Sequence, residues 1–292
     1  MPPASHRVQV GNRTWQLGEL IHVLGILNVT PDSFSDGGKY LEPENALEQA
    51  REMVSQGAHA IDVGGESTRP GADPVPAGEE LNRILPIIRL LKRELDVPIS
   101  VDTYKHRVAQ EAIAAGADLV NDISGLALDP EMARGLAGTD TPVILGNLRG
   151  TPRTMREAPP YRDPVAEVIA ELEQSVRRAV EAGISRERIL IDPGIGFAKK
   201  PADNLKILAR LADFHSLGLP LVIGSSNKSF LGALFDLPVD RRAEATLASE
   251  VIAVMNGAHV IRTHRVLPCL RAVRLADAVR GARAEAIPGE GR

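Results

Sequence analysis

Cysteine and aromatic residues are both scarce in this sequence, and each scarcity narrows the kinds of protein it can be. The single cysteine, Cys269, has no partner in the chain for a disulfide and lies in a helix-like stretch away from any pattern of metal ligands. We therefore expect Cys269 to be a small buried hydrophobic residue and not a nucleophile. Aromatic residues make up only 3% of the chain, so the core must be built from Ala, Val, Ile and Leu.

Long apolar runs and an excess of positive charge are missing as well. Residues 1–7 lack the apolar region of a signal peptide, and no run approaches the ~18 apolar residues that a membrane-spanning helix needs. The formal net charge is −4 and the isoelectric point is near 6.0. This balance argues against a protein that coats nucleic acid or an acidic membrane. The sequence predicts a cytoplasmic globular protein with no nucleic-acid or membrane partner.

Several motifs of nucleotide and metal sites are absent too. The phosphate-binding pattern G-x-x-x-x-G-K-S/T does not occur, and neither H-x-H nor H-E-x-x-H is present, so a zinc ion held by protein ligands is not expected. The dinucleotide pattern G-x-G-x-x-G follows none of the expected strands.

What the chain does contain is a regular alternation of short apolar runs with longer amphipathic ones. Runs rich in Val, Ile and Leu at every position are typical of parallel strands that helices cover. Eight such units in a chain of 292 residues fit a single (β/α)8 TIM barrel, an α/β fold, better than an open doubly wound sheet. The expected strands are residues 23–28, 60–64, 99–102, 119–122, 143–147, 189–192, 221–224 and 260–262.

Helix signals lie between these runs. Pro43 precedes a helix expected over residues 44–55, and Gly57 follows it. The clearest helix is expected over residues 164–182, with Asp163 as its N-cap and an apolar stripe at helical spacing.

The expected barrel domain, residues 19–283, is flanked by two short segments. Residues 8–17, with Gly11 and Asn12 at their centre, predict a small hairpin within an N-terminal segment of residues 1–18. Residues 284–292 are rich in Gly, Pro and charge, which predicts a disordered tail.

Polar side chains stand at the end of every expected strand. In a barrel these positions meet at one mouth, where active sites lie. Each of four residues has an alternative interpretation as a helix cap or turn residue, namely Asp102, Asn121, Asp122 and Asp192, and a lone His264 is more often structural. Their joint occurrence favours a ligand site. The strand-end residues are Asn28, Asp62, Glu66, Asp102, Asn121, Asp122, Asn147, Asp192, Ser226, Asn227, Lys228, Arg262 and His264.

Cationic residues follow the late strands, whereas hydrogen-bond acceptors end the earlier strands. Lys228, Arg262, His264 and Arg265 predict a basic cluster beside the last two strands, where barrels often bind phosphate. Acceptors from the earlier strands suit the N–H groups of a flat heterocycle. Two loops dense in turn formers, residues 30–38 and 66–71, would overhang the mouth as mobile lids.

These residues resemble the dihydropteroate synthase family, and the resemblance covers nearly the whole chain. The first two motifs are highly specific, and all of them occur in the family's order. The matching stretches are GILNVTPDSFSDGG (25–38), DVGGESTRPGA (62–72), SVDT (100–103), NDISG (121–125), DPGIGF (192–197), KSFLG (228–232) and RTH (262–264).

The resemblance implies condensation of 6-hydroxymethyl-7,8-dihydropterin pyrophosphate with p-aminobenzoate, with Mg²⁺ as cofactor, in a homodimer that sulfonamides target. It assigns the pterin to Asp102, Asn121, Asp192 and Lys228. It assigns the pyrophosphate to Asn28, Arg262 and His264, and it makes Asn28 the metal ligand as well. The p-aminobenzoate site would comprise Phe34, Thr68, Arg69, Pro70, Phe197 and Ser229. The catalytic set would be Asp36, Asp102, Lys228, Arg262 and His264.

The chain departs from the family pattern in three places. Gly146-Asn147-Leu148 stands where the family usually has Met-His-Met, Asn227 replaces an Arg, and Arg265 stands where an Asp is common. The expected pterin residues are unchanged, so these departures bear on catalysis. They suggest a loss of positive charge at position 227 and a gain at position 265.

Two alternative functions remain open at this point. One is a catalytically weak pterin-binding paralogue with a regulatory or stabilising role. The other is a methyltransferase that passes a methyl group from a reduced folate to a corrinoid protein. The residues expected to bind p-aminobenzoate and pyrophosphate argue against the methyltransferase, which needs neither.

Overall fold

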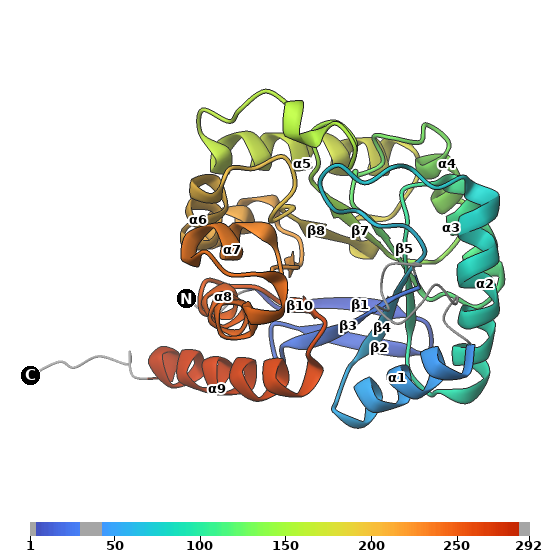
Figure 1. Cartoon of the computed structure of the whole chain (residues 1–292), viewed down its shortest axis with the longest axis horizontal. Helices are drawn as coiled ribbons and strands as arrows, with labels where there is room; N and C mark the ends of the chain where they lie inside the picture. The colour runs from blue at the N-terminus through green and yellow to red at the C-terminus, as the bar shows by residue number, and fades with distance from the viewer. Residues whose placement is uncertain (1–3, 30–42, 286–292) are drawn as a thin grey trace, which may run out of the picture.

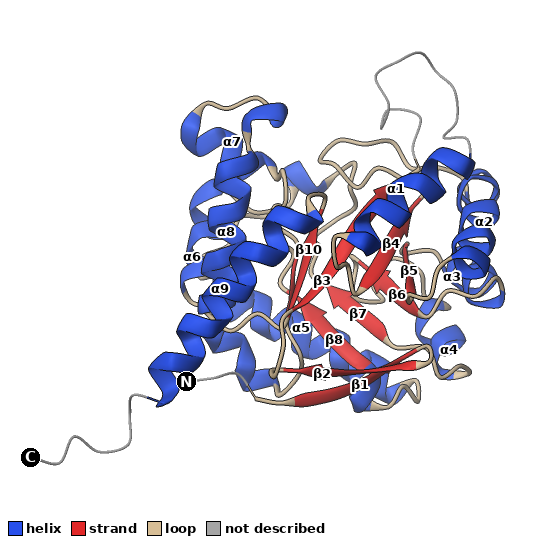
Figure 2. Cartoon of the chain, turned by 90° about the horizontal axis from the view of Figure 1, so that it is seen from below, coloured by secondary structure: helices blue, strands red, loops and turns tan. Residues whose placement is uncertain are grey.

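Eight parallel strands form the barrel of this computed structural model, which describes residues 4–29 and 43–285. Neighbouring strands follow the order β8-β7-β6-β5-β4-β3-β10-β9, and a bridge between Ile191 and Leu221 joins the two outermost strands. The barrel therefore closes on itself (Figures 1 and 2). Its strands are β3 (His22–Asn28), β4 (Ala60–Gly64), β5 (Ile99–Asp102), β6 (Leu119–Asp122), β7 (Val143–Gly146), β8 (Ile189–Asp192), β9 (Val222–Ile223) and β10 (Val260–Thr263).

Helices follow the strands and surround the barrel (Figure 1). In α5, Pro164 begins the helix and the Asp163 carboxylate accepts hydrogen bonds from the backbone of Val165 and Ala166, as its sequence predicted. None of the helices within the described ranges is long and apolar enough to cross a membrane. The helices are α1 (Pro43–Ser55), α2 (Ala77–Glu94), α3 (His106–Ala114), α4 (Met132–Ala137), α5 (Pro164–Glu181), α6 (Pro201–Ala209), α7 (Ser229–Phe235), α8 (Ala243–Met255) and α9 (Val266–Glu285), with 3-10 turns η2 (Met155–Glu157), η3 (Arg186–Arg188), η4 (Leu211–Leu217) and η5 (Val239–Arg241).

The predicted (β/α)8 barrel is confirmed, with small differences at strand ends. The strand β9 covers two residues and not the expected four, because Leu221 joins β8 as an isolated bridge. The strand β7 stops at Gly146, one residue early, since the carbonyl of Asn147 faces the side chain of Lys199. The helix α9 includes Ala284 and Glu285, which the composition had assigned to a disordered tail; residues 286–292 lie outside the described part of the chain.

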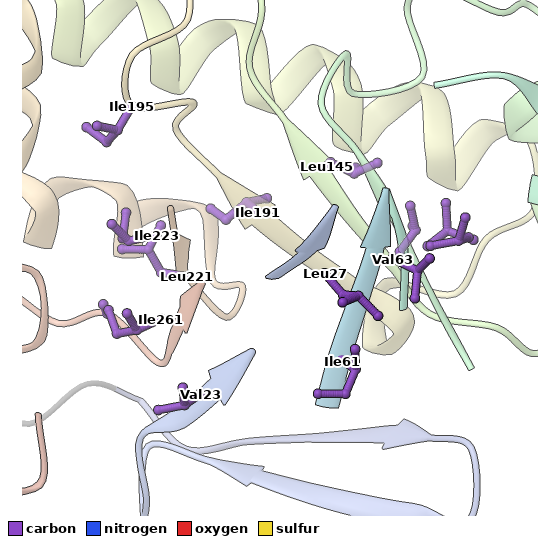
Figure 3. Packing of buried hydrophobic residues seen from close by; sticks show 14 of the residues in the cluster. Val23, Leu27, Ile61, Val63, Leu145, Ile191, Ile195, Leu221, Ile223 and Ile261 are labelled. Carbon is purple, nitrogen blue, oxygen red and sulfur yellow. The ribbon is translucent and has the colours of Figure 1, made fainter. Parts of the chain in front are cut away.

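Side chains alternate between the two faces of each barrel strand. Those facing the helices are aliphatic and form the large core, part of which Figure 3 shows, with Ile61, Val63, Ile191, Ile223 and Ile261 on the strands. The alternate positions face the barrel interior. At its lower level these are apolar, namely Leu24, Ala60, Leu119, Ile144, Leu190, Val222 and Val260.

The N-terminal hairpin closes the bottom of the barrel. Its strands, β1 (His6–Val10) and β2 (Arg13–Leu17), pair antiparallel about Gly11 and Asn12, as predicted. Val8, Val10, Trp15 and Leu17 are buried against the lower interior layer. Figure 2 shows the hairpin across the end of the barrel opposite the tips of the strands. The open end is therefore the mouth formed by the C-terminal ends of the strands.

Candidate active site at the mouth of the barrel

Polar residues occupy the interior positions one level above the apolar layer. Strand register places Asn28 beside Gly64, Gly64 beside Asp102, and Asp102 beside Asn121. On the far side, Asp192 lies beside Gly146. The expected convergence of strand-end residues follows from this register, because the strands are parallel and their ends lie level.

Arg262 lies at the centre of this layer, paired with two carboxylates. Its Nε donates to Asp62 Oδ2, and its Nη2 lies 2.5 Å from Asp102 Oδ2. Asn121 also donates to Asp62 Oδ2, over 3.3 Å. The sequence had placed Arg262 in a basic cluster apart from the acceptors, and that separation is wrong. One oxygen each of Asp62 and Asp102 stays buried without a hydrogen-bond partner.

Burial governs the acid–base properties of these groups. It raises the pKa of Asp102 to about 7, a shift that Asp62 reinforces and Arg262 opposes. Burial lowers the pKa of Lys228 to about 8, and the charge of Arg262 adds to the effect while Asp192 opposes it. Asp102 and Lys228 thus titrate closer to neutral pH than a free carboxyl or amine, as groups that meet a polar ligand often do.

A recess opens beside Arg262, and we call it the mouth recess. Lys228 Nζ lies 3.8 Å from the centre of the Phe197 ring at its wall, and the Lys228 stem packs so tightly on Gly196 that a Cβ there would lie 2.9 Å from Cδ. The lining residues are Asn121, Ile123, Gly146, Asp192, Gly194, Ile195, Phe197, Gly224, Lys228 and Arg262. Three of the four residues expected to hold a pterin therefore line one recess.

Asp192 and Asp122 also perform the structural roles that were their alternative interpretation. Asp192 Oδ1 accepts the backbone N–H of Gly194 over 2.7 Å, which shapes the turn after β8. Asp122 is fully buried and its carboxylate accepts from Ser124 and Leu126, so it serves the loop after β6. Asp102 caps no helix, because α3 begins only at His106.

His264 and Asn28 form the opposite rim. His264 Nδ1 lies 2.9 Å from Ser226 Oγ, and its Nε2 lies 3.5 Å from Asn28 Nδ2. Burial and, to a smaller extent, the charges of Arg262, Lys228 and Arg69 together lower the pKa of His264 to about 4, so the imidazole is neutral at pH 7.

The remaining expected residues come from loops. Thr68, Arg69 and Pro70 follow β4, and the backbone N–H of Gly71 bonds to Pro152 O over 2.8 Å. Ser229 is exposed at the start of α7. Phe34 and Asp36 lie outside the described residues.

Two participants were not in the predicted site. Asp62 had been noted only as a strand end, yet it is fully buried and binds both Arg262 and Asn121. Ser226 had also been noted only as a strand-end residue, and it contacts the imidazole of His264. Asp62 and Ser226 lie two residues from Gly64 and Gly224, respectively, and residues two apart in an extended strand face the same side. This spacing is the sequence pattern that could have placed them in the site.

The three departures from the family pattern lie in different surroundings. Asn147 is buried at the end of β7 and bonds to Glu171 and Lys199. Asn227 has a left-handed backbone, with φ of 57°, and its carbonyl accepts from Arg242 over 3.0 Å. Arg242 thus brings a cation to the backbone of position 227. Arg265 is exposed, and its charge acts on Glu250, whose pKa burial raises to about 7.

Asn28 is the one side chain that the sequence assigned to a metal ion. Among residues 4–29 and 43–285, no three His, Cys, Asp or Glu side chains are grouped to hold a metal. Asn28 Oδ1 would lie 3.4 Å from a Cβ at Gly64, so the absence of a side chain there leaves space beside this oxygen. A cation at this rim would take most of its ligands from a bound substrate and water.

Comparison with known proteins agrees with this geometry. Residues 24–264 match the family described as "Pterin binding enzyme". The dihydropteroate synthase of Bacillus subtilis (strain 168) is 46% identical over 257 residues, which cover 88% of each chain.

Solved structures with the same fold include complexes with small molecules. The Yersinia pestis dihydropteroate synthase, in complex with a sulfonamide drug, has a TM-score of 0.89 and 41% identity, covering 94% of this chain and 99% of its own. The Xanthomonas albilineans dihydropteroate synthase with 4-aminobenzoic acid has a TM-score of 0.88 and 39% identity, covering 98% of this chain and 100% of its own.

Proposed function

The chain belongs to the dihydropteroate synthase family of pterin-binding enzymes, and we propose that its barrel mouth joins 6-hydroxymethyl-7,8-dihydropterin pyrophosphate to p-aminobenzoate. The products are 7,8-dihydropteroate and pyrophosphate, so the enzyme is a transferase of folate biosynthesis. The observation that carries this proposal is the mouth recess, where Asn121, Asp192 and Lys228 face one small volume beside Arg262.

The pterin ring would bind on the interior layer of the barrel. Asp102, Asn121 and Asp192 offer oxygen atoms to the ring N–H groups, and Lys228 offers a donor to a ring acceptor. Asp102 is now paired with Arg262, so the ring would compete with the guanidinium for this carboxylate. A polar ligand that satisfies the unpartnered oxygens of Asp62 and Asp102 would recover part of their burial cost.

The pyrophosphate group would lie on the side of His264 and Asn28, within reach of Arg262. The C–O bond to pyrophosphate breaks first and leaves a cation at the exocyclic methylene, which the pterin ring stabilises by electron donation. The amine of p-aminobenzoate then forms the C–N bond and loses one proton. Positive charge from Arg262 and Lys228 favours the departure of the anion. His264 would bind the anion as a hydrogen-bonding group.

Mg²⁺ is part of this proposal, with Asn28 as its ligand from the chain. The space beside Asn28 Oδ1 suits an ion that keeps several waters and substrate oxygens, and the described residues group no other three His, Cys, Asp or Glu ligands. When bound, the ion would neutralise charge on the leaving pyrophosphate.

The second substrate would bind above the recess. Phe197 supplies an aromatic wall, and we assign to the same site Thr68, Arg69 and Pro70 of the loop after β4 and Ser229 at the start of α7. We assign the loop residues Phe34 and Asp36 to the side of the second substrate as well, as the sequence suggests.

We also propose a homodimer. Apolar side chains are exposed on α7 and on the packed helices α8 and α9, and exposed apolar surface of this kind favours protein contact. Phe235, Ile252 and Leu275 are examples, and Figure 1 shows these helices on one side of the barrel. Sedimentation at micromolar concentration should give twice the chain mass. A location in the cytoplasm stays a prediction from the sequence.

The direct test is turnover by purified protein with Mg²⁺ and both substrates. Pyrophosphate release should match dihydropteroate formation, identified by mass, and Lys228→Ala should abolish both. Pterin binding without product would favour the catalytically weak paralogue. Activity only with a corrinoid protein and a methylated folate would favour the methyltransferase.

A further inference from the structure

Lys199 lies in the loop between β8 and α6, and its side chain turns back towards the end of β7. Its ammonium donates to Asn147 Oδ1 over 2.7 Å, to Phe197 O over 3.1 Å and to Asn147 O over 3.4 Å. All three donors of the ammonium thus face oxygens from two loops that are far apart in the sequence. The sequence did not predict this lysine as a site residue.

Asn147 is itself fixed, so that its oxygen must face Lys199. Its Nδ2 donates to Glu171 Oε2 over 2.7 Å, and Tyr161 donates to its Oδ1 over 3.2 Å. Glu171 in turn accepts from Arg149 Nε over 2.7 Å. Because Asn147 is buried, this network holds the amide in one orientation.

The loop that Lys199 holds is tightly packed and conformationally strained. A Cβ at Gly194 would lie 2.0 Å from Asn147 O, so the backbone of the loop crosses directly over Asn147. Ala198, between Phe197 and Lys199, has a left-handed backbone with φ of 51°, a conformation that side-chain-bearing residues rarely adopt. Such strain persists only where the surroundings impose it, and the ammonium of Lys199 is one of those constraints.

This loop forms one wall of the mouth recess. Gly194, Ile195 and Phe197 line it, and the Phe197 ring carries the ammonium of Lys228 on its face. Phe197 is buried against Ile123 and Met155. A shift of the loop would therefore move the aromatic wall, whereas Lys228 is anchored separately at the start of α7.

We propose that Lys199 is a positioning residue for the second substrate. By joining the Phe197 carbonyl to Asn147, it keeps the Phe197 ring in place as a wall for the aromatic amine. The proposal rests on the proposed function, because it takes p-aminobenzoate as that amine. Burial lowers the pKa of Lys199 to about 7, an effect that Glu171 and Asp192 oppose and Arg149 and Lys228 reinforce.

The test compares Lys199→Met with Lys200→Met. Methionine keeps the length of the stem and removes the ammonium, and Lys200 is an exposed lysine next to it in the chain. We expect Lys199→Met to raise the KM for p-aminobenzoate about tenfold while kcat and pterin affinity change less than about twofold, since a small displacement of a positioning group is costly. Lys200→Met should match the parent protein.

Amide hydrogen exchange gives a readout that does not depend on turnover. In Lys199→Met, exchange of a peptide covering residues 193–198 should accelerate about tenfold or more, with the barrel strands unchanged. The double variant Lys199→Met/Asn147→Ala should add little to either single change, because both remove the same contact.

Two outcomes would overturn the proposal. One is an unchanged KM for p-aminobenzoate with unchanged exchange in residues 193–198. The other is an equal loss of pterin binding together with faster exchange throughout the barrel, which is what a purely structural lysine would give. If the parent protein makes no dihydropteroate, the proposed function fails, and the exchange experiment alone then decides whether Lys199 holds this loop.

Discussion

At the scale of single residues, the mouth depends on a few side chains with two partners each. Arg262 is the clearest case, because its guanidinium joins Asp62 to Asp102 across the barrel interior. Removing one member of such a buried group leaves the others with an unpaired charge. Changes at Arg262 should therefore affect ligand binding and stability together.

Arg262→Ala should weaken the pterin pyrophosphate by about a hundredfold and p-aminobenzoate by less than about threefold, since only the first substrate carries the pyrophosphate. It should also lower the free energy of unfolding by about 3 kcal/mol, because Asp62 and Asp102 lose their partner. Titration calorimetry with each ligand and urea unfolding provide the measurements. Equal losses for both ligands would contradict the assignment of Arg262 to the pyrophosphate side.

Asn227 allows a test of backbone conformation at the site. Its φ of 57° suits Asn or Gly, whereas Arg would pay about 1 kcal/mol for the left-handed conformation. Arg242 already contacts its carbonyl. We expect Asn227→Gly to retain the parent's stability, and Asn227→Arg to lose about 1 kcal/mol in urea unfolding without faster turnover. A clear rise in turnover for Asn227→Arg would indicate that the missing cation limits catalysis.

At the scale of elements, the hairpin β1–β2 supplies the apolar side chains that close the bottom of the barrel. Its inward residues continue the lower interior layer, where the strands offer small and aliphatic side chains. Its turn also fits closely, because a Cβ at Gly11 would lie 2.4 Å from Asp118 Oδ1. The hairpin therefore belongs to the folded barrel and is not a detachable extension.

Trp15→Ala should test this role. Trp15 is buried, and loss of a large aromatic side chain from a packed site costs about 3–5 kcal/mol. Thr14→Ala, on the exposed face of the same strand, should cost less than about 0.5 kcal/mol. Circular dichroism during urea unfolding can compare the two. A similar small effect for both variants would show that the hairpin contributes little to the barrel's stability.

At the scale of the whole molecule, the two ends of the barrel differ in their response to pH. The lower end gathers His6, His22, His59, His215 and His259, with ring centres of neighbours 4.6–5.4 Å apart. Burial is the main cause of a lowered pKa in each, and it brings His22 and His259 to about 4. His59 Nδ1 and His259 Nδ1 accept backbone N–H groups, which requires the unprotonated nitrogen. The other charges that act on these rings are Arg13, Arg274 and Arg280.

These histidines should therefore contribute a loss of stability as the pH falls from about 6.5 to about 4, whereas Asp102 and Glu250, whose pKa values burial raises to about 7, contribute in the opposite direction. In this window the unfolded chain binds protons at these histidines and the folded chain does not, so protonation favours unfolding. The loss should be on the order of 2–3 kcal/mol for each of the two most shifted histidines. Fluorescence of the single tryptophan can follow urea unfolding at several pH values. His259→Asn, which keeps an acceptor near Nδ1, should reduce the slope, and an unchanged slope would contradict this origin.

The sequence by itself determined the barrel and the residues of its mouth. Aliphatic strands at regular spacing specify a covered parallel sheet, and parallel strands necessarily bring their polar C-terminal residues, such as Asp102, Asn121 and Asp192, to one end. The hairpin and the N-cap at Asp163 follow from local chemistry, which a short stretch of sequence contains in full.

Only the tertiary structure decided how these side chains pair. Arg262 meets Asp62 and Asp102, which lie 200 and 160 positions away in the chain, and no local pattern specifies such a contact. The same holds for Lys199 with Asn147, 52 positions apart, and for Arg242 near Asn227. Long, flexible cations can reach several acceptors at a crowded mouth, and the choice among them depends on burial and on competing partners that exist only once the barrel has closed.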